Sequence, residues 1–254
     1  MPKVSVIMAS YNHAAFVREA VDSVFAQSYQ DLELVITDDG SRDGTAGIIY
    51  GMKDPRLRFH ALAENRGACV AANDAIERAQ GEYCAVLNSD DYFLPGKLQR
   101  QVEFLDAHPA VGAVFGQPRF VDERGRRIKQ SKHFIGKTFS GQNRSRQEWL
   151  KHFFYVGNAL CHPTVMLRKS CYDQVGLFDP LLMQLPDLDM WVRICRDFEI
   201  HVLPDELTAF RILDRERNVS APTREKMARL AWEMGAILEP VSYTHLTLPT
   251  NREV

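Results

Sequence analysis

Up to about Gly116, short apolar runs alternate with segments whose apolar residues recur at helical spacing. The expected strands cover residues 4–9, 32–37, 57–61, 82–87 and 111–115, and the expected helices lie around 16–24, 45–53, 68–79 and 97–107. Strands that alternate with helices build βαβ units, in which helices cover both faces of a mainly parallel sheet. The sequence therefore predicts an α/β fold with a mostly parallel central sheet flanked by helices.

The regular alternation ends after about Gly116. Residues 119–145 are basic and irregular, and we expect a hairpin or a loop there. Further helices are expected at 147–154, 169–175, 187–198 and 223–238, and further strands at 164–167 and 199–202. We predict one continuous domain with two halves, residues 1–116 and residues 117–240.

Residues 241–254 look unlike the chain before them. They resemble the translated read-through of a sequencing adapter, and such segments are left out of fold reasoning. A genuine extended tail is the alternative. We expect the natural chain to have been truncated near Pro240.

Composition excludes some classes of protein. The net charge is −2, so no basic field argues for nucleic acid or for an anionic membrane as a partner. The five cysteines form no C-x-x-C pair, which favours a reducing compartment. The first apolar run is too short for a signal peptide, and no later run approaches the length of a membrane span. We expect a cytoplasmic protein, which could still attach to the inner face of a membrane.

Two adjacent carboxylates, Asp90 and Asp91, follow the apolar run at residues 83–87. In open α/β sheets, ligands bind beyond the carboxyl ends of the strands. Adjacent negative charges repel unless a cation or hydrogen bonds compensate them, and Mg²⁺ typically takes one or two protein carboxylates plus substrate phosphates. These residues therefore suggest a metal-phosphate site. The alternative is a helix cap, with Pro95 opening the next helix.

The ends of the first two strands also carry polar groups. Ser10, Tyr11 and Asn12 follow the first strand, with no G-x-G-x-x-G fingerprint of a dinucleotide site. Tyr11 could stack on a base or could be an ordinary loop aromatic. After the second strand, Asp38 and Asp39 could accept from a base or ribose, or could belong to a turn with a helix cap. A calcium loop is rejected, because its closing position would be Tyr50.

Asp187 and Asp189 lie in the first turn of a helix whose apolar face includes Leu188 and Trp191. Acidic residues there are favourable to the helix dipole, so capping is one interpretation. The functional interpretation makes one of them a general base that removes a proton from an acceptor hydroxyl.

Taken in order, these clusters resemble glycosyltransferase family 2, whose members have the Rossmann-like GT-A fold. The matching segments are VSVIMASYN (4–12), DDGSRDGT (38–45), NRG (65–67), GEY (81–83), LNSDD (87–91) and DLDMW (187–191), with NVS (218–220) as a late loop. The resemblance covers nearly the whole chain up to about Ser220. Each motif is weak alone, but their order and spacing together are specific.

The resemblance implies a role for several positions. Residues 1–116 become the nucleotide-sugar-binding half and residues 117–240 the acceptor-binding half. Asp39 matches the residue that recognises the nucleotide base, with Asp38 as a helper. Ser10 and Tyr11 match the loop under the base. Asp90 and Asp91 match the metal-binding acidic motif, with Asp91 as the direct ligand. Asp187 matches the catalytic base, and Asp189 and Trp191 match residues on the acceptor side.

Some positions depart from the family pattern. Ala9 stands where many members have Pro, Asn88 where many have Asp, and Pro186 where an acidic residue often precedes the base. Ala72 stands where many members have an Arg that contacts phosphate, so the donor pyrophosphate would lean on the metal or on Arg66. Arg66, His162 and Arg211 are candidate phosphate or acceptor contacts, and a structural role is the alternative for each.

The resemblance implies an inverting, metal-dependent glycosyltransferase. The donor would be a nucleoside-diphosphate sugar, with UDP favoured, the cofactor Mg²⁺ or Mn²⁺, and the acceptor a glycan or a lipid-linked hydroxyl. Bacterial surface-glycan synthesis is the expected setting. The alternatives are a catalytically inactive relative that binds nucleotide or glycan, and a sugar-phosphate nucleotidyltransferase, which usually has a Gly-rich phosphate loop after its first strand.

Overall fold

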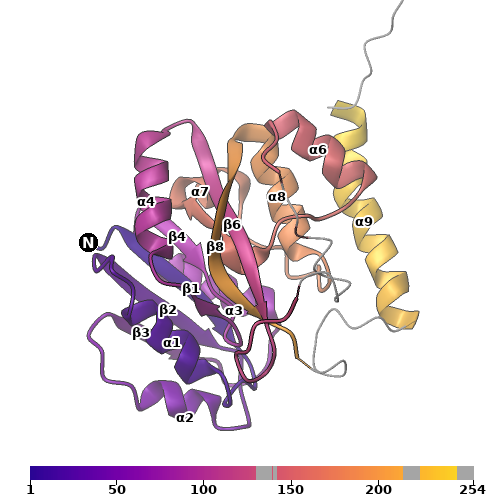
Figure 1. The fold of residues 1–254 in the computed structure, drawn as a ribbon. Helices are drawn as coiled ribbons and strands as arrows, with labels where there is room; N and C mark the ends of the chain where they lie inside the picture. The colour runs from indigo at the N-terminus through magenta and orange to yellow at the C-terminus, as the bar shows by residue number, and fades with distance from the viewer. Residues whose placement is uncertain (130–138, 140–141, 214–223, 245–254) are drawn as a thin grey trace, which may run out of the picture.

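The computed structural model describes residues 1–129, 139, 142–213 and 224–244 of the 254-residue chain (Figure 1). Within these ranges one sheet contains β1 (Val4–Ser10), β2 (Leu32–Asp38), β3 (Leu57–Ala61), β4 (Tyr83–Val86), β5 (Tyr92–Phe93), β6 (Val111–Val121), β7 (Met166–Arg168) and β8 (Glu199–Arg211). The α-helices are α1 (Val17–Phe25), α2 (Thr45–Tyr50), α3 (Ala68–Arg78), α4 (Lys97–Ala107), α6 (Arg146–Tyr155), α7 (Lys169–Val175), α8 (Pro186–Asp197) and α9 (Arg224–Thr244), with a 3₁₀ turn, η2, at His162–Thr164.

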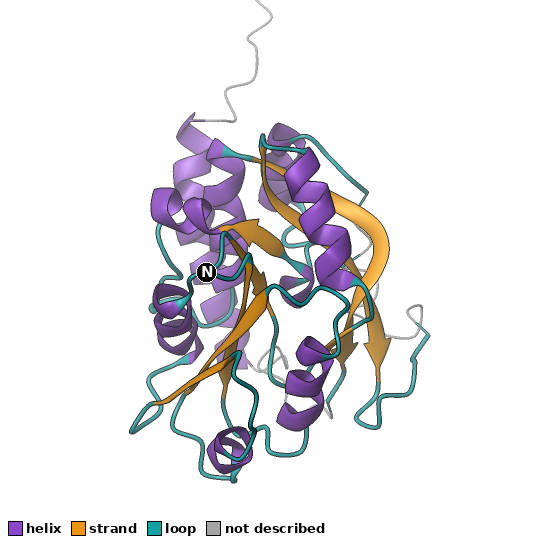
Figure 2. Cartoon of the chain, turned by 90° about the vertical axis from the view of Figure 1, so that its left-hand side faces the viewer, coloured by secondary structure: helices purple, strands orange, loops and turns teal. Residues whose placement is uncertain are grey.

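The strands are ordered β3-β2-β1-β4-β7-β6-β8-β5. The first four strands are parallel to one another, as are β6 and β8, whereas β7 and β5 are antiparallel to their neighbours. The predicted α/β class is therefore confirmed. The sheet twists through the middle of the molecule with helices on both sides (Figure 2).

Alternate residues of the central strands face two different hydrophobic cores, as the two-residue period of a strand requires. Val4, Val6 and Met8 of β1 pack with α1 and α4 in one core. Ile7 of the same strand packs in the other core with α3, α6 and α8. Because both faces are covered, these strands appear in the sequence as nearly continuous apolar runs.

The strands of the C-terminal half are longer than the sequence predicts. β6 has 11 residues and β8 has 13, where the sequence predicts strands only at 111–115 and 199–202. They pair with each other in parallel over almost their full length, with three register shifts that accommodate irregular positions such as Gly116 and Pro118. Within the expected loop at 119–145, the chain turns back after β6, because Val121 bridges Arg127. Residues 130–138 and 140–141 of that prediction lie outside the described residues.

The helix-cap alternative for Asp90 and Asp91 is wrong. The segment after them is the short strand β5, and α4 begins only at Lys97, with Gly96 as its N-cap. Gly96 has φ of +81°, a conformation that favours glycine. The two carboxylates therefore need another explanation than a helix terminus.

The last helix, α9, runs to Thr244, so it extends past the expected end at residue 238. The rest of the suspected tail, residues 245–254, lies outside the described residues. No helix in the described ranges is long and apolar enough to cross a membrane.

Candidate active site

The carboxyl ends of β1 and β2 lie side by side, with Ser10 paired to Asp38. The Asp38 carboxylate accepts hydrogen bonds from the Ser10 hydroxyl (2.8 Å) and from the backbone amide and hydroxyl of Ser41 (2.8 and 2.7 Å). Asp38 is buried, so these bonds satisfy a carboxylate that would otherwise be costly to enclose. Ser10 and Asp38 thus shape the loops at this edge of the sheet.

Asp39 connects the end of β2 to the loop before α3. Its carboxylate oxygens accept from the backbone amides of Arg66 (2.7 Å) and Gly67 (2.9 Å). Gly40 allows this close approach, because a Cβ there would lie 2.5 Å from the backbone carbon of Glu64. Each carboxylate oxygen can accept one more hydrogen bond, so Asp39 keeps capacity for a base N–H although it is buried. The Arg66 side chain is exposed beside it.

Tyr11 is held on an ordered loop and exposes its ring. Asn12, at φ of +53°, donates its backbone amide to the Ser41 hydroxyl oxygen (2.8 Å), and its side-chain oxygen accepts from the Arg42 amide (2.9 Å). These bonds join the loops after β1 and β2. Tyr11 is 42% exposed, so its ring is accessible to a stacking partner.

Asp91 is buried at the end of the β4 segment. Its Oδ1 accepts from the backbone amide of Arg211 (2.7 Å) and its Oδ2 from the side-chain amide of Asn88 (2.9 Å). Burial raises its pKa well above the usual range, and the adjacent Asp90 charge raises it further. Burial also raises the pKa of Asp90, which is partly offset by the nearby His13 and Arg211.

A hard divalent cation fits this pair. Two adjacent carboxylates in a poorly solvated place form an oxygen donor set whose repulsion a cation would relieve. The described residues contain no group of three or more His, Cys, Asp and Glu side chains that could hold a metal without help. A metal here would therefore take one or two ligands from the protein and the rest from phosphate and water, which is the usual arrangement for Mg²⁺.

Arg211 has a structural role here. Its Nε donates to the Asp90 carbonyl (2.8 Å), and its other nitrogens donate to Glu19 and to the carbonyls of residues 122 and 123. The guanidinium is buried over the rings of Phe16 and Tyr92. It therefore fixes the end of β8 against the acidic pair, and its donors are already engaged.

Asp187 lies in the first turn of α8 and is partly exposed. Oδ1 accepts from the Leu188 amide (2.8 Å), and Oδ2 accepts from the Asn158 side chain (2.7 Å). Poor solvation raises its pKa to about 6, against the lowering effect of these hydrogen bonds. A carboxylate with such a pKa is ionised at neutral pH and is more basic than an ordinary aspartate.

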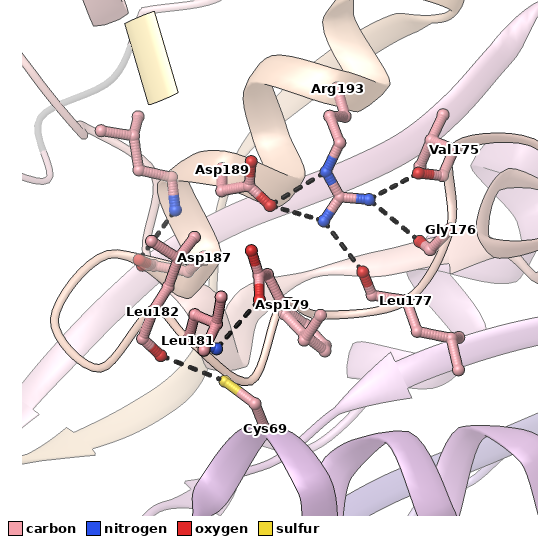
Figure 3. Close-up of polar contacts among 12 residues, drawn as sticks. Cys69, Val175, Gly176, Leu177, Asp179, Leu181, Leu182, Asp187, Asp189 and Arg193 are labelled. Carbon is pink, nitrogen blue, oxygen red and sulfur yellow. Dashed lines mark hydrogen bonds and ion pairs between the residues drawn. The ribbon is translucent and has the colours of Figure 1, made fainter. Parts of the chain in front are cut away.

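Asp189, two residues further on, is a different kind of carboxylate. Its Oδ2 accepts from Nε (2.9 Å) and Nη2 (2.6 Å) of Arg193, whose other donors reach the carbonyls of residues 175–177 (Figure 3). The ion pair lies within α8, and the bonds from Arg193 to these carbonyls tie α8 to the end of α7. Of the two candidate bases, Asp189 is neutralised by a cation, whereas Asp187 carries only neutral hydrogen-bond donors.

Two other residues expected near the acceptor lie in the core. Trp191 is fully buried and packs edge-to-face on Phe115, with ring centroids 4.8 Å apart. His162 packs beside Trp191, and burial lowers its pKa to about 4. Its Nε2 is buried without a hydrogen-bond partner among the described residues.

The acidic pair and Asp187 share one region of the molecule. Cys161, on the loop before η2, is buried, and burial raises the pKa of its thiol. The charges of Asp91 and Asp187 raise this pKa further, so both carboxylates lie within electrostatic range of one sulfur atom. The structure therefore brings together two acidic motifs that are about a hundred residues apart in the sequence.

Sequence reasoning missed Asn158, which contacts Asp187, and Glu233, which binds the start of α8. The Glu233 carboxylate accepts from the backbone amides of residues 183, 184 and 185, each at 2.9 Å. Asn158 stands in a loop and Glu233 in a late helix, and neither belongs to a motif. No local signal in the sequence marks them, because their partners are distant along the chain.

Comparison with known proteins identifies the family. The family model described as glycosyl transferase family 2 matches residues 5–168. An uncharacterized glycosyltransferase of Methanocaldococcus jannaschii is 27% identical over 231 residues, covering 89% of this chain and 76% of that protein. The putative teichuronic acid biosynthesis glycosyltransferase TuaG of Bacillus subtilis is 47% identical over 106 residues, covering 41% of this chain and 42% of that protein.

Solved structures share the fold. Residues 1–349 of Staphylococcus aureus TarS, in complex with UDP-GlcNAc, align with a TM-score of 0.71 at 22% identity, covering 92% of this chain and 66% of that one. The mannosyltransferase PcManGT of Pyrobaculum calidifontis, in complex with GDP-Man and Mn²⁺, aligns with a TM-score of 0.63 at 20% identity, covering 97% and 70%. At these identities the likeness shows the fold alone. The family model covers more than half of the chain, and this protein therefore belongs to glycosyl transferase family 2 and is a glycosyltransferase.

Proposed function

We propose that the protein is an inverting, metal-dependent glycosyltransferase that moves a sugar from a nucleoside-diphosphate sugar to an acceptor hydroxyl. One observation carries the proposal. Among the described carboxylates with a resolved pKa shift, those whose pKa is raised are Asp90, Asp91 and Asp187. Carboxylates of the structural type, such as Glu33 and Asp74, have lowered pKa values. Perturbed groups gathered in one region are typical of a catalytic site.

In this proposal, Asp187 is the general base. Asp187 takes the proton of the acceptor hydroxyl, and the acceptor oxygen forms a bond to the anomeric carbon. The bond from that carbon to the diphosphate oxygen breaks on the opposite face, and the nucleoside diphosphate leaves with the electron pair. The configuration at the anomeric carbon is therefore inverted. General-base assistance of this kind is typically worth about 10²–10⁴ in rate.

The donor half of the site uses the ends of β1, β2 and β4. Asp39 would accept from the base, Tyr11 would stack on it, and Ser10 and Asp38 would hold these loops in place. Arg66 would reach the phosphates. Asp91, helped by Asp90, would hold Mg²⁺ or Mn²⁺, which when bound neutralises charge on the diphosphate.

Related proteins support a UDP-sugar donor and a surface glycan as product. TarS is described with UDP-GlcNAc, PcManGT with GDP-Man and Mn²⁺, and TuaG as a teichuronic acid biosynthesis enzyme. We favour UDP, and a glycan or lipid-linked acceptor in bacterial surface-glycan synthesis. A lipid-linked acceptor would place the enzyme in the cytoplasm, at the inner face of the membrane.

Turnover of the Asp187→Asn variant tests the proposal. Wild-type protein would first be screened with UDP-, GDP- and dTDP-sugars by thermal shift, and then assayed for nucleoside diphosphate release with an acceptor present. We expect Asp187→Asn to lose about 10²–10⁴ in turnover and to keep the affinity for UDP. Asp189→Asn is the matched control, because it changes the same chemistry in the same helical turn. This variant should have the turnover of the wild type but a lower melting temperature, because it loses the ion pair with Arg193.

Isothermal titration with UDP separates the metal role from the base role. Asp91→Ala should lose the gain in affinity that Mn²⁺ gives to the wild type. Equal affinity of Asp91→Ala and wild type in the presence of Mn²⁺ would contradict the metal assignment. UDP binding without any product release from wild type, across the donor panel, would favour an inactive nucleotide-binding relative.

A further inference from the structure

Asn158 lies on the loop between α6 and η2 and has two partners. Its side-chain oxygen accepts from the backbone amide of Leu160 (2.9 Å). Its side-chain nitrogen donates to Oδ2 of Asp187 (2.7 Å). The bond from Leu160 decides which end of the amide is the oxygen, so the NH₂ group must point to the carboxylate.

The two bonds fix the plane of the Asp187 carboxylate. Leu188 holds Oδ1 through its backbone amide (2.8 Å), and Asn158 holds Oδ2. Two of the four acceptor positions of the carboxylate are thereby used, and the other two remain for a substrate hydroxyl. A base held in one orientation contributes more than a freely rotating one, because a misplacement of about 1 Å can cost 10²-fold in rate.

We propose that Asn158 is a positioning residue, which orients the Asp187 carboxylate toward the acceptor hydroxyl and keeps it in its ionised form. This inference rests on the proposed function. Asparagine suits the task because it donates without adding charge. An aspartate at 158 would still accept from Leu160, but it would place a second carboxylate against the first.

In the described part of the chain, the thiols and the imidazole around Asp187 do not ionise near pH 6. Burial raises the pKa values of the Cys69 and Cys161 thiols, so these remain neutral. His162 has its pKa lowered to about 4 and is neutral in this range. The remaining charged groups nearby are Asp179 on the loop after α7, the Asp189–Arg193 pair of α8 and the Glu233–Arg229 pair of α9. Asp90 and Asp91 also have raised pKa values, but the hydrogen-bond partners of Asn158 are Asp187 and Leu160, so a shift of the acid limb in the Asn158 variants reports on Asp187.

The test compares the pH dependence of kcat in three variants. Asn158→Asp keeps the loop bond and puts two carboxylates together, which then share a proton. We expect the acid limb of its kcat profile to move up by about one pH unit or more. Its kcat should be about tenfold below that of the wild type at pH 6, and this difference should become smaller as the pH rises. Asn158→Ala removes the donor without adding charge. It should lower kcat by about tenfold even at pH values well above the acid limb, move that limb upward, and leave the donor KM within about twofold.

Asn73→Asp is the matched control. Asn73 also makes two bonds to loop backbone, donating to the Phe178 carbonyl (2.8 Å) and accepting from the Phe178 amide (3.0 Å), and it does not contact Asp187. This variant should have a lower melting temperature than the wild type and the same pH dependence of kcat. A wild-type profile in both Asn158 variants, or the same shift in Asn73→Asp, would overturn the inference.

A second measurement does not depend on turnover. Carbon-13 NMR of the aspartate carboxyl groups, assigned with Asp187→Asn, gives the pKa of Asp187 in each folded variant. Asn158→Ala should raise it, since it removes a bond that favours the ionised form. If wild type showed no transferase activity but this shift were seen, the proposed function would fail while the coupling of Asn158 to Asp187 stood. An unchanged pKa would overturn the coupling itself.

Discussion

At the scale of single residues, the acidic pair costs the protein stability. The pKa of Asp91 is raised by burial and by Asp90, so the folded state holds a proton more tightly than the unfolded chain does. A folded-state pKa above the unfolded value makes stability fall as pH rises from the ordinary aspartate pKa through the raised one. A protein selected for stability alone would have little reason to keep both charges there.

Asp90→Asn should therefore stabilise the metal-free protein. Without the Asp90 charge, Asp91 ionises at a smaller cost, and we expect a gain on the order of 1 kcal/mol at pH 8 that disappears near pH 4. Urea unfolding in EDTA at the two pH values measures the gain. The same variant should show a smaller rise in melting temperature than wild type when Mn²⁺ and UDP are added together.

The exposed Asp173→Asn is the control for a general charge effect. It should change neither the stability in EDTA nor the response to Mn²⁺ and UDP. Equal or lower stability of Asp90→Asn at pH 8 would show that the two carboxylates do not repel each other in the folded protein.

The sequence indicates which polar residues stand at the ends of strands. It does not indicate which residues from distant parts of the chain form hydrogen bonds to the site. Asp90 and Asp91 stand directly after an apolar run, where parallel strands place their ligands. Asp187 emerged from a helical pattern, but the pattern could not distinguish it from Asp189. That distinction depends on Arg193 and Asn158, whose contacts exist only once the chain is folded.

At the scale of elements, α8 depends on a helix that follows it in the chain. The N-cap of α8, Leu185, offers no side-chain acceptor, and Pro186 occupies the first turn. The buried Glu233 of α9 accepts from three backbone amides of the segment that leads into α8, and Arg229 pairs with it at 2.8 Å. A carboxylate at a helix N-terminus also interacts favourably with the helix dipole.

Glu233→Gln should destabilise the protein by about 2–4 kcal/mol, because a buried network keeps its donors but loses one acceptor oxygen and its charge. Urea unfolding at pH 7 measures the loss. The exposed Glu77→Gln on α3 is the matched control and should change stability by less than about 0.5 kcal/mol. A Glu233→Gln variant as stable as this control would mean that the Glu233 carboxylate does not stabilise the segment that leads into α8.

The sequence predicts which helices and strands form better than it predicts how long they are. Apart from the two-residue β5, which was not expected, the N-terminal strands and helices were expected close to their observed bounds, and β1, β2 and β4 are buried on both faces. β6 and β8 continue through Pro118 and Pro204, which interrupt the strand pattern in the sequence. Their length is set by pairing with each other, with register shifts at the irregular positions, and such pairing is not visible in either segment alone.

At the scale of the whole molecule, the two halves of the chain are interleaved in one sheet. β7, from the second half, lies between β4 and β6, which belong mostly to the first. β5, from the first half, forms the edge next to β8. Residue 116 lies inside β6. Each half therefore completes the hydrogen bonding of the other, and a donor-binding half without its partner would expose unpaired strand edges.

We predict that the two halves unfold in one transition. All three tryptophans, Trp149, Trp191 and Trp232, lie after residue 117, so their fluorescence reports the C-terminal half, whereas far-UV circular dichroism reports the whole chain. Trp149 and Trp191 are fully buried and should dominate the fluorescence change.

Urea curves from the two probes should have the same midpoint, as a cooperative domain requires. UDP with Mn²⁺, which we propose to bind to loops of the first half, should raise the fluorescence midpoint by the same amount as the dichroism midpoint. Fluorescence lost at lower urea, or left unmoved by UDP, would mean that the acceptor half folds independently and that the shared sheet does not couple it to the nucleotide.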